Sequence, residues 1–324
     1  MRESVTLVLV LTAAACGGQA PMPAPTPQTA PGAPSSAATG CARTSVGLTP
    51  LSDLTGSYQG QAGGLYPGGS NTPPPYHLAA GSSLASSIGP LDAEGNANAN
   101  GRYVFLSIGM SNTTQEFSTF KPLADADAAK HPRLVIVDGA QGGVTANQWA
   151  SASCPCWGTV DARLTAAGVT PRQVVAAWVK LANANPTQAF PVHAQLLRDN
   201  IIAALRNLKA RYPNLRLAYV SSRIYAGYAT TALNPEPYAY ESAFAVRDVI
   251  AAQLNGSLND APWVAWGPYL WADGLTPRSD GLTWACSELA DDGTHPSVSG
   301  RRKVADQLLA FVKSDPTARI WFSR

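Results

Sequence analysis

The sequence predicts an α/β fold built on a parallel sheet. Buried strand patterns alternate with helix patterns along the chain, and this alternation is typical of a parallel sheet with helices on both faces. The strand patterns are continuous apolar runs, which suit strands that are covered on both sides. No internal repeat and no second break in composition follows Cys41. We therefore expect a single α/β domain from residue 41 to residue 324.

The expected strands occupy residues 101–109, 133–143, 173–183 and 215–225, with a short last strand within 262–272 that runs into a loop. Helix patterns, with apolar residues at i, i+3, i+4 and i+7, cover residues 193–212, 240–254 and 299–315. Residues 113–116 suit the start of a helix after the first strand. The stretch YPGGSNTPPPYH, residues 66–77, is too rich in glycine and proline for regular structure. It could form a loop over the functional site.

The composition sets limits on function. The chain has 324 residues, of which 45% are hydrophobic, and this is enough for one large domain with a sizeable core. Charged residues make up 14% of the chain and the formal net charge is +2. This balance gives no electrostatic reason to expect a nucleic-acid partner.

The N-terminus resembles an export signal. Arg2, a short apolar core over residues 5–11 and small residues after it make up a segment too short to span a membrane. We interpret residues 1–15 as a signal peptide. LTAAAC, ending at Cys16, resembles a bacterial lipobox, although Ala13 stands where a leucine is usual. In such signals the peptide is cut before the cysteine, which is then lipidated.

Residues 16–40 are rich in proline, alanine and glycine and are expected to form a flexible tether. The sequence thus predicts an exported lipoprotein, periplasmic or on the cell surface, that meets the membrane only through a lipid on Cys16. Plain cleavage after the alanines would instead give a secreted protein.

Four further cysteines indicate disulfides in an exported protein: Cys41, Cys154, Cys156 and Cys286. The loop between Cys154 and Cys156 looks too short to close without strain. We therefore expect Cys41 and Cys286 each to pair with one of those two. A metal site is the weaker interpretation, because CPC lacks the spacing of zinc knuckles and no nearby histidine completes a site.

A serine lies at the end of the first expected strand. In VFLSIGMSNTTQEF, Ser111 comes two residues after a glycine and just before the helix-start residues. Such a serine is either part of a tight turn or a nucleophile held beside backbone N–H groups. A serine nucleophile needs a base within hydrogen-bond reach, and the base needs an acceptor on its other ring nitrogen. In DDGTHPS, Asp292 and His295 could supply both.

An oxyanion hole is the third requirement of acyl transfer. The N–H of Ser111 at a helix N-terminus is one candidate donor. The glycines of GAQGGVT, Gly142 and Gly143, allow a close approach to the backbone. Asn183 could add a side-chain amide. GAQGG and Asn183 could equally be ordinary turn residues.

In this order the segments resemble the four blocks of the SGNH (GDSL-like) hydrolases. IGMSN resembles the first block of the acetylxylan-esterase-like and sialate-esterase-like branch, and GAQGGVTANQW resembles its second block. DDGTHPS resembles the final D-x-x-H-P block, and WVKLAN stands where the third block belongs. The resemblance spans residues 102–309. By it Gly143 is the expected oxyanion glycine, with Gly142 as its neighbour, and Trp149 and Asn112 are expected to bind substrate.

Two positions depart from the family pattern. The third block has Leu181 in place of a glycine and Ala184 in place of an acid, so Lys180 or Asn185 is an alternative to Asn183 as the polar group. In the first block Met110 replaces the usual acid before the serine, as in the branch named above.

The resemblance implies a flavodoxin-like three-layer α/β/α sandwich around a parallel sheet. It also implies a serine esterase that uses neither a metal nor an organic cofactor, with Ser111, Asp292 and His295 as the catalytic residues. The expected substrate is a short-chain O-acyl ester, such as an O-acetyl group on a carbohydrate. Loop aromatics (Trp149, Trp157, Tyr269 and Trp271) could stack on a sugar or could pack in the core.

Two alternatives stay open. One is a lipase or arylesterase for longer acyl chains, and the other is a surface lipoprotein that binds glycan without hydrolysing it.

Overall fold

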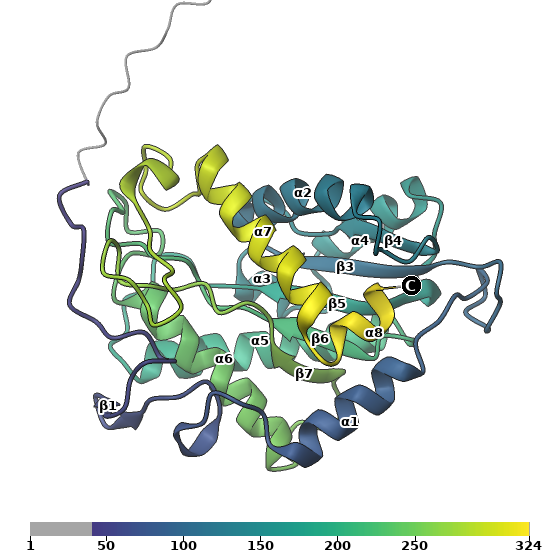
Figure 1. The fold of residues 1–324 in the computed structure, drawn as a ribbon, viewed down its shortest axis with the longest axis horizontal. Helices are drawn as coiled ribbons and strands as arrows, with labels where there is room; N and C mark the ends of the chain where they lie inside the picture. Colours follow the sequence, from purple (N-terminus) through teal and green to yellow (C-terminus); the bar gives the residue numbers. More distant parts are fainter. Residues whose placement is uncertain (1–40, 324) are drawn as a thin grey trace, which may run out of the picture. The chain divides into compact units, whose positions relative to one another are not determined.

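The computed structural model describes residues 41–323. The expected signal peptide, the tether and Cys16 lie outside the described residues. The sheet consists of five parallel strands, and helices cover both of its faces (Figure 1). The strands are β3 (Tyr103–Gly109), β4 (Leu134–Asp138), β5 (Val174–Lys180), β6 (Leu217–Val220) and β7 (Trp263–Trp266), in the spatial order β4-β3-β5-β6-β7. This is the flavodoxin-like order, and the expected three-layer α/β/α fold is confirmed.

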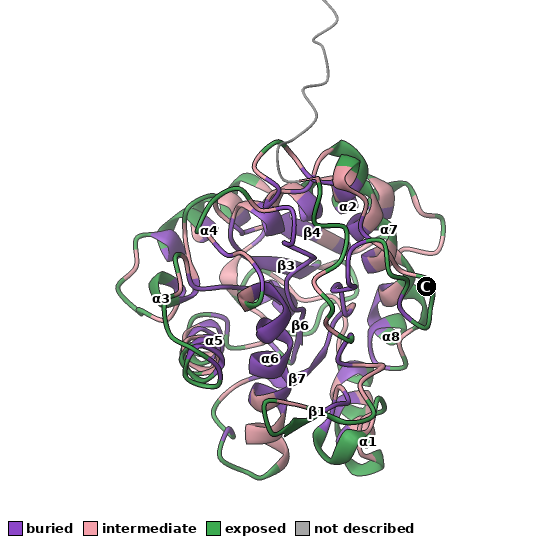
Figure 2. Ribbon diagram, turned by 90° about the vertical axis from the view of Figure 1, so that its left-hand side faces the viewer, coloured by how far each residue is buried: buried purple, intermediate pink, exposed green. Residues whose placement is uncertain are grey.

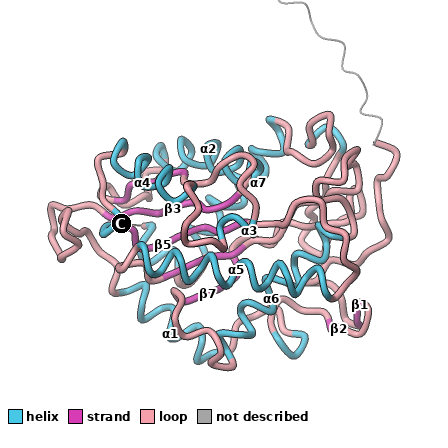
Figure 3. Tube along the Cα trace, turned by 180° about the vertical axis from the view of Figure 1, so that it is seen from behind, coloured by secondary structure: helices cyan, strands magenta, loops and turns pink. Residues whose placement is uncertain are grey.

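Right-handed crossovers account for the two helical layers. The chain moves one way from β3 to β4 and the opposite way from β4 to β5, β6 and β7, so its connecting helices lie on opposite faces. One layer holds α1 (Pro75–Ser86), α2 (Ser111–Ala126), α7 (Val298–Ser314) and α8 (Ala318–Phe322), as Figure 2 shows. The other holds α3 (Ala146–Trp149), α4 (Cys156–Ala166), α5 (Val192–Arg211) and α6 (Tyr238–Leu254). Figure 3 shows α5 and α6 side by side across this face.

Central strands β3 and β5 are buried along their whole length. The apolar runs that predicted them therefore reflect real burial on both faces. Four of the five runs extend past the end of their strands: β4 ends at Asp138, β5 at Lys180, β6 at Val220 and β7 at Trp266. Residues 221–228 remain buried without pairing in the sheet. An apolar run therefore predicted burial more reliably than strand pairing.

Residues 66–77 contain more regular structure than expected and do not cover the candidate site. They include a short 3-10 helix, η1 (Pro67–Gly69), and the first turns of α1. Pro75 opens α1, where a proline is tolerated because its missing N–H would have no partner. A ring nitrogen of His77, Nε2, lies 2.9 Å from the Val264 carbonyl oxygen of β7. The segment thus packs at the β7 edge, at the opposite end of the sheet from β4.

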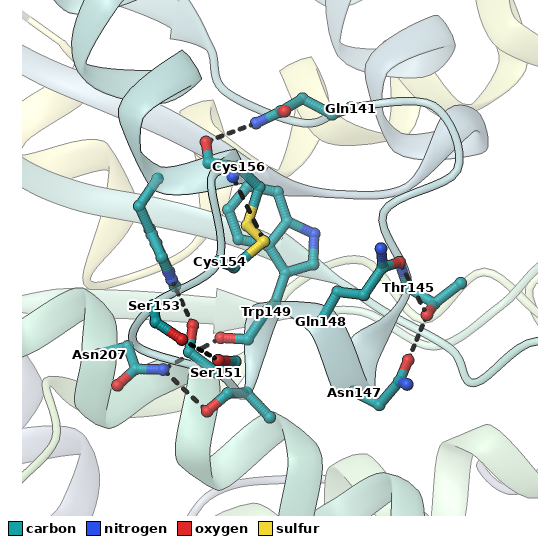
Figure 4. Close-up of a disulfide and its surroundings, with 12 residues drawn as sticks. Gln141, Thr145, Asn147, Gln148, Trp149, Ser151, Ser153, Cys154, Cys156 and Asn207 are labelled. Carbon is teal, nitrogen blue, oxygen red and sulfur yellow. Dashed lines mark hydrogen bonds between the residues drawn. A yellow bond between two sulfur atoms is a disulfide. The ribbon is translucent and has the colours of Figure 1, made fainter.

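All four domain cysteines form disulfides, as expected, but the predicted pairing is wrong. Cys41 pairs with Cys286, and Cys154 pairs with Cys156 (Figure 4). The turn that opens α4 brings the Cα atoms of Cys154 and Cys156 to 5.2 Å, inside the range of roughly 4.4–6.8 Å that disulfides span. At the other pair, the Leu275 N–H donates to the Thr44 carbonyl at 2.7 Å and so aligns the two segments.

Among residues 41–323, no helix has both the length and the hydropathy needed to cross a bilayer.

Candidate active site

Ser111 is the first residue of α2, immediately after the turn that ends β3. The turn requires a glycine, because a Cβ on Gly109 would stand 2.5 Å from the Lys180 carbonyl oxygen of neighbouring β5. The Thr113 hydroxyl donates to the same carbonyl at 2.8 Å. These contacts fasten the first turn of α2 to the carboxyl end of β5. The backbone N–H of Ser111 is thereby held at a helix N-terminus, where negative charge is favoured.

Asp292 and His295 share the loop before α7. Asp292 Oδ1 accepts hydrogen bonds from the backbone N–H groups of Thr294 at 3.0 Å and His295 at 2.9 Å, while Oδ2 lies 2.5 Å from His295 Nδ1. Gly293 has φ +62°, and a Cβ there would lie 1.9 Å from the Tyr228 carbonyl oxygen. The glycine of the D-x-x-H spacing is therefore what lets the loop curl onto itself and turn both side chains the same way.

The hydroxyl of Ser111 completes a hydrogen-bonded chain. Ser111 Oγ lies 2.6 Å from His295 Nε2, although 184 residues separate them in the sequence. The side chains of His295 and Asp292 are 23% and 33% exposed, so the triad is open to solvent on one side. Burial raises the pKa of the Asp292 carboxyl, but hydrogen bonds from His295 and Thr294 outweigh it and hold the pKa below its usual value. Asp292 is thus ionised at neutral pH.

The glycine loop after β4 passes beside Ser111. The Gln141 N–H donates to the Gly109 carbonyl at 3.0 Å, which fixes the start of this loop. A Cβ built on Gly142 would stand 4.0 Å from the Ser111 Cβ, whereas one on Gly143 would meet no atom within 4 Å. Within residues 41–323, the N–H groups of Gly142 and Gly143 have no hydrogen-bond acceptor. The Cβ position of Gly142 thus faces Ser111, and Gly143 lies at the bend of the turn with φ +78°. The expectation that Gly143 supplies the oxyanion N–H stays a prediction.

Asn183 follows β5, the strand next to β3. Asn200 of α5 donates to Asn183 Oδ1 at 2.9 Å, so the amide is oriented with Nδ2 on its free side. Asn183 is 9% exposed, and Nδ2 has no acceptor among the described residues. Asn183 is thus an oriented amide at the end of the strand next to β3, and its role as an oxyanion donor stays a prediction.

The two alternatives to Asn183 differ from it in exposure. Lys180 is fully buried and bonds both carboxylate oxygens of Glu116, at 2.6 and 2.7 Å. Burial lowers the pKa of Lys180 to about 8 and raises that of Glu116. The Lys180 ammonium is thus already paired with a carboxylate of α2. Asn185 is exposed and lies in the cavity-lining segment described below.

The two residues expected to bind substrate instead support the site from within. Trp149 is 0% exposed and donates its indole N–H to the Gly109 carbonyl at 3.2 Å. It packs edge to face on Trp157, with ring centroids 4.8 Å apart, beside the Cys154–Cys156 disulfide (Figure 4). Asn112 is 1% exposed and donates to the Thr294 carbonyl at 2.9 Å. The prediction of direct substrate contact is wrong for both in this structure, because packing takes them out of solvent.

The remaining loop aromatics, Trp157, Tyr269 and Trp271, are buried as well. The core-packing interpretation of these residues is therefore the correct one.

Sequence reasoning missed two supporting side chains. Asp138, at the end of β4, accepts hydrogen bonds from Ser107 Oγ at 2.5 Å and from the Thr114 hydroxyl, and so ties β4 to α2. An acid closing a buried strand was a usable signal for it. Asn200 lies within an amphipathic helix, and nothing in its local sequence marks it as the partner of Asn183.

No group of three or more His, Cys, Asp or Glu side chains within residues 41–323 is arranged to hold a metal ion.

The fold and this site define an α/β protein with a hydrogen-bonded Ser–His–Asp triad at the carboxyl edge of its sheet. No family model matches the chain, and no curated protein matches it in sequence. Among solved structures, a Bacteroides fragilis protein assigned as an acylhydrolase shares 13% identity at a TM-score of 0.41, over 77% of this chain and 100% of that one.

Two further structures are comparably distant. An extracellular lipase from Streptomyces rimosus shares 12% identity at a TM-score of 0.33, over 64% of this chain and 99% of that one. A Bacillus subtilis protein shares 12% identity at a TM-score of 0.37, over 65% of this chain and 56% of its own. These likenesses are too remote to assign an activity or a site, so the function rests on the chain's own geometry.

Proposed function

We propose that this protein is an SGNH-type serine esterase that hydrolyses short-chain O-acyl esters, with O-acetyl groups on carbohydrate as the substrate class. The observation that carries the proposal is the unbroken hydrogen-bond chain from Ser111 Oγ through His295 to Asp292. A glycan-binding protein would have no chemical need for this chain. The first, second and last sequence blocks support the same family, and the S-N and G-G-T-plus-Trp forms of the first two support the carbohydrate-esterase branch.

The mechanism is acyl transfer in two halves. His295 Nε2 takes the proton from Ser111 Oγ as that oxygen attacks the ester carbonyl carbon, and Asp292 stabilises the imidazolium that forms. The carbonyl oxygen gains negative charge, which the N–H groups of Ser111 and of Gly143, with its neighbour Gly142, and the amide of Asn183 would stabilise. His295 then donates its proton to the departing alkoxide, leaving the acyl group on Ser111.

Hydrolysis of the acyl-enzyme repeats these steps with water. His295 removes a proton from the attacking water, and the collapse of the second intermediate returns that proton to Ser111 Oγ. The products are a carboxylic acid and an alcohol, so each turnover consumes one water molecule and leaves the enzyme unchanged. No step in this sequence calls for a redox partner.

The packing behind Gly109, at the end of β3, supports a short acyl chain. The buried indoles of Trp149 and Trp157 fill the space behind Gly109. A long acyl chain could not extend into the protein on this side without displacing them, and opening such a space in a packed core costs several kcal/mol.

We also propose that the protein is exported and held at a membrane by a lipid on Cys16, either periplasmic or at the cell surface, with secretion as the alternative. The signal-like residues 1–15 and the paired domain cysteines support export. Mass spectrometry of the protein from a bacterial host, before and after mutation of Cys16 to serine, tests lipidation.

The enzymatic proposal is tested with p-nitrophenyl esters from acetate to octanoate. We expect kcat/KM to fall as the acyl chain lengthens. Ser111→Ala and His295→Ala should each lower kcat by roughly 10⁴–10⁶-fold, as is usual when one member of such a unit is lost.

Turnover that rises with chain length would favour a lipase. Hydrolysis that is unaffected by Ser111→Ala would contradict the mechanism. A folded wild-type protein without turnover would favour a glycan-binding protein.

A further inference from the structure

A cavity of about 350 Å³ with a mixed polar and apolar lining opens at the same edge of the sheet as Ser111. It lies between the loop after β4, the loop after β5 and the start of α5, and its volume falls within the roughly 300–1,000 Å³ of small-molecule sites. Five carboxamide side chains line it: Asn147, Asn183, Asn185, Gln188 and Asn200. None of its lining residues is Asp, Glu, Lys or Arg. The chemistry of the cavity therefore suits a neutral ligand with many hydrogen-bonding groups.

His193 supports the wall of this cavity from behind. It is 1% exposed, and its Nδ1 lies 3.1 Å from Glu241 Oε2, whose carboxylate also accepts from the Tyr58 hydroxyl at 2.9 Å. The imidazole packs edge to face on the ring of Tyr238, with ring centroids 4.7 Å apart. Because Nε2 is enclosed by protein, the carboxamides are the polar groups that a ligand in the cavity would meet.

The cavity is close to the triad. Thr145 lies on its wall, three residues after Gly142, which is next to Ser111. Three residues of extended chain span at most about 11 Å. The Ala146 N–H donates to the Ala182 carbonyl at 3.0 Å, which joins this loop to the end of β5. Asn183, the candidate oxyanion amide, is itself a wall residue.

The wall formed by residues 183–188 is held in place before any ligand binds. Asn185 has φ +50°, a left-handed conformation that asparagine tolerates better than most residues, and its N–H donates to the Leu233 carbonyl at 2.8 Å. Asn234 donates to the Asn183 carbonyl at 3.3 Å. Ala184, Pro186 and Leu196 form an apolar strip beside the carboxamides.

We infer that this cavity is the subsite for the alcohol part of the ester and takes a neutral sugar residue, an assignment that rests on the proposed esterase function. Carboxamides both donate to and accept from sugar hydroxyls. The apolar strip would contact the C–H face of the ring. A long alkyl alcohol would make no hydrogen bonds with the carboxamides, and an anionic or cationic ligand would find no countercharge in the lining.

Two exposed wall residues allow a test that keeps the buried core intact. Asn147→Ala removes one carboxamide, and Leu196→Arg fills the mouth with a bulky cation; Leu196 is 44% exposed. Ile320→Arg on α8, at a residue that is 39% exposed, is the matched control. Kinetics of the full chain are measured with O-acetylated xylo-oligosaccharides and with p-nitrophenyl acetate, whose alcohol is a small aromatic.

We expect Asn147→Ala to lower kcat/KM for the acetylated saccharide about fivefold more than for p-nitrophenyl acetate, mainly through KM. Leu196→Arg should lower kcat/KM for the acetylated saccharide at least about tenfold more than for p-nitrophenyl acetate. Ile320→Arg should leave the ratio of the two kcat/KM values as it is in the wild type. Equal losses on both substrates, or no loss on either, would overturn the assignment.

A binding measurement separates this inference from the esterase proposal. Calorimetry with unacetylated xylo-oligosaccharides, on Ser111→Ala and on Ser111→Ala combined with Leu196→Arg, needs no catalysis. Saturable binding that Leu196→Arg abolishes supports the subsite even if hydrolysis proves independent of Ser111. Absence of saturable binding to Ser111→Ala overturns the subsite while leaving the triad chemistry intact.

Discussion

Two histidine–carboxylate pairs occupy the same edge of this molecule and differ in almost every other respect. His295 and Asp292 are three residues apart, 23% and 33% exposed, and His295 presents Nε2 to a serine hydroxyl. His193 and Glu241 come from α5 and α6 and are 1% and 2% exposed, and His193 Nε2 has no partner within residues 41–323. The same pair of groups is thus placed once beside a serine hydroxyl, where the proposed mechanism uses the histidine as a base, and once as a buried pair in a cavity wall.

The difference shows that the partner on the far ring nitrogen decides what such a pair can do. A carboxylate on Nδ1 orients the ring in both cases. Only at His295 is there a hydroxyl within reach to be deprotonated. Solvent access also favours His295 as the base of the proposed mechanism. An imidazolium is less costly at a partly exposed ring beside Asp292 than at a fully buried ring.

The largest expected effect separates the two carboxylates. Asp292→Asn should lower kcat for p-nitrophenyl acetate by roughly 10⁴-fold, because the amide cannot stabilise the imidazolium and favours the wrong tautomer of His295. Glu241→Gln should lower it by no more than about threefold, because His193 has no role in the chemistry. Steady-state kinetics of both variants, with circular dichroism to verify folding, provide the measurement. Comparable losses in the two would mean that the pairs are not functionally distinct.

A smaller effect is expected from Asn112, which supports the loop that holds Asp292 and His295. Asn112→Ala removes the hydrogen bond to the Thr294 carbonyl and leaves that buried acceptor unpaired. We expect kcat to fall roughly tenfold with little change in KM, and the free energy of unfolding to fall by about 1–2 kcal/mol. Asn207→Ala, which removes hydrogen bonds to the carbonyls of Trp149 and Ala150 away from the histidine loop, is the matched control. If it lowers kcat as much, Asn112 acts through general stability alone.

The smallest expected effect is on stability against pH. The pKa of Asp292 is lower in the folded protein than its ordinary value of 3.8, so its ionised form contributes stability above pH 3.8, and this contribution is lost as the pH falls through the folded-state pKa. Asp292→Asn should therefore be less stable than wild type at pH 7, with a difference that shrinks below pH 4. Urea unfolding at a series of pH values measures this. A difference that stays constant with pH would contradict the assigned pKa direction.

Local sequence patterns predicted the parts of the site that lie on short segments. The D-x-x-H spacing predicted the Asp292–His295 contact because a four-residue loop brings i and i+3 together. The strand-to-helix turn at Ser111 followed from an apolar run, a glycine and helix-start residues. At Gly109 and Gly293 the fold requires the glycine that the local pattern supplies, because the backbone of a distant segment occupies the place where a Cβ would be.

Contacts between distant segments were beyond such patterns. The burial of Trp149 and Asn112, the approach of Gly142 to Ser111, and the orientation of Asn183 by Asn200 each depend on how one segment packs on another. The disulfide pairing was missed for the same reason, because it depends on the path of residues 41–46 along the loop after β7 and on the turn before α4.

The sequence by itself determined the alternation of strand and helix, the identity of the two central strands and the residue types of the triad, because burial and periodicity are local properties of a chain. Only the tertiary structure decided that Ser111 and His295, 184 residues apart, are in hydrogen-bond contact. It also decided that His193, an ordinary helix residue by its sequence, lies in the wall of a cavity and is hydrogen-bonded to the carboxylate of Glu241. Such contacts depend on the packing of whole elements, which no short stretch of sequence encodes.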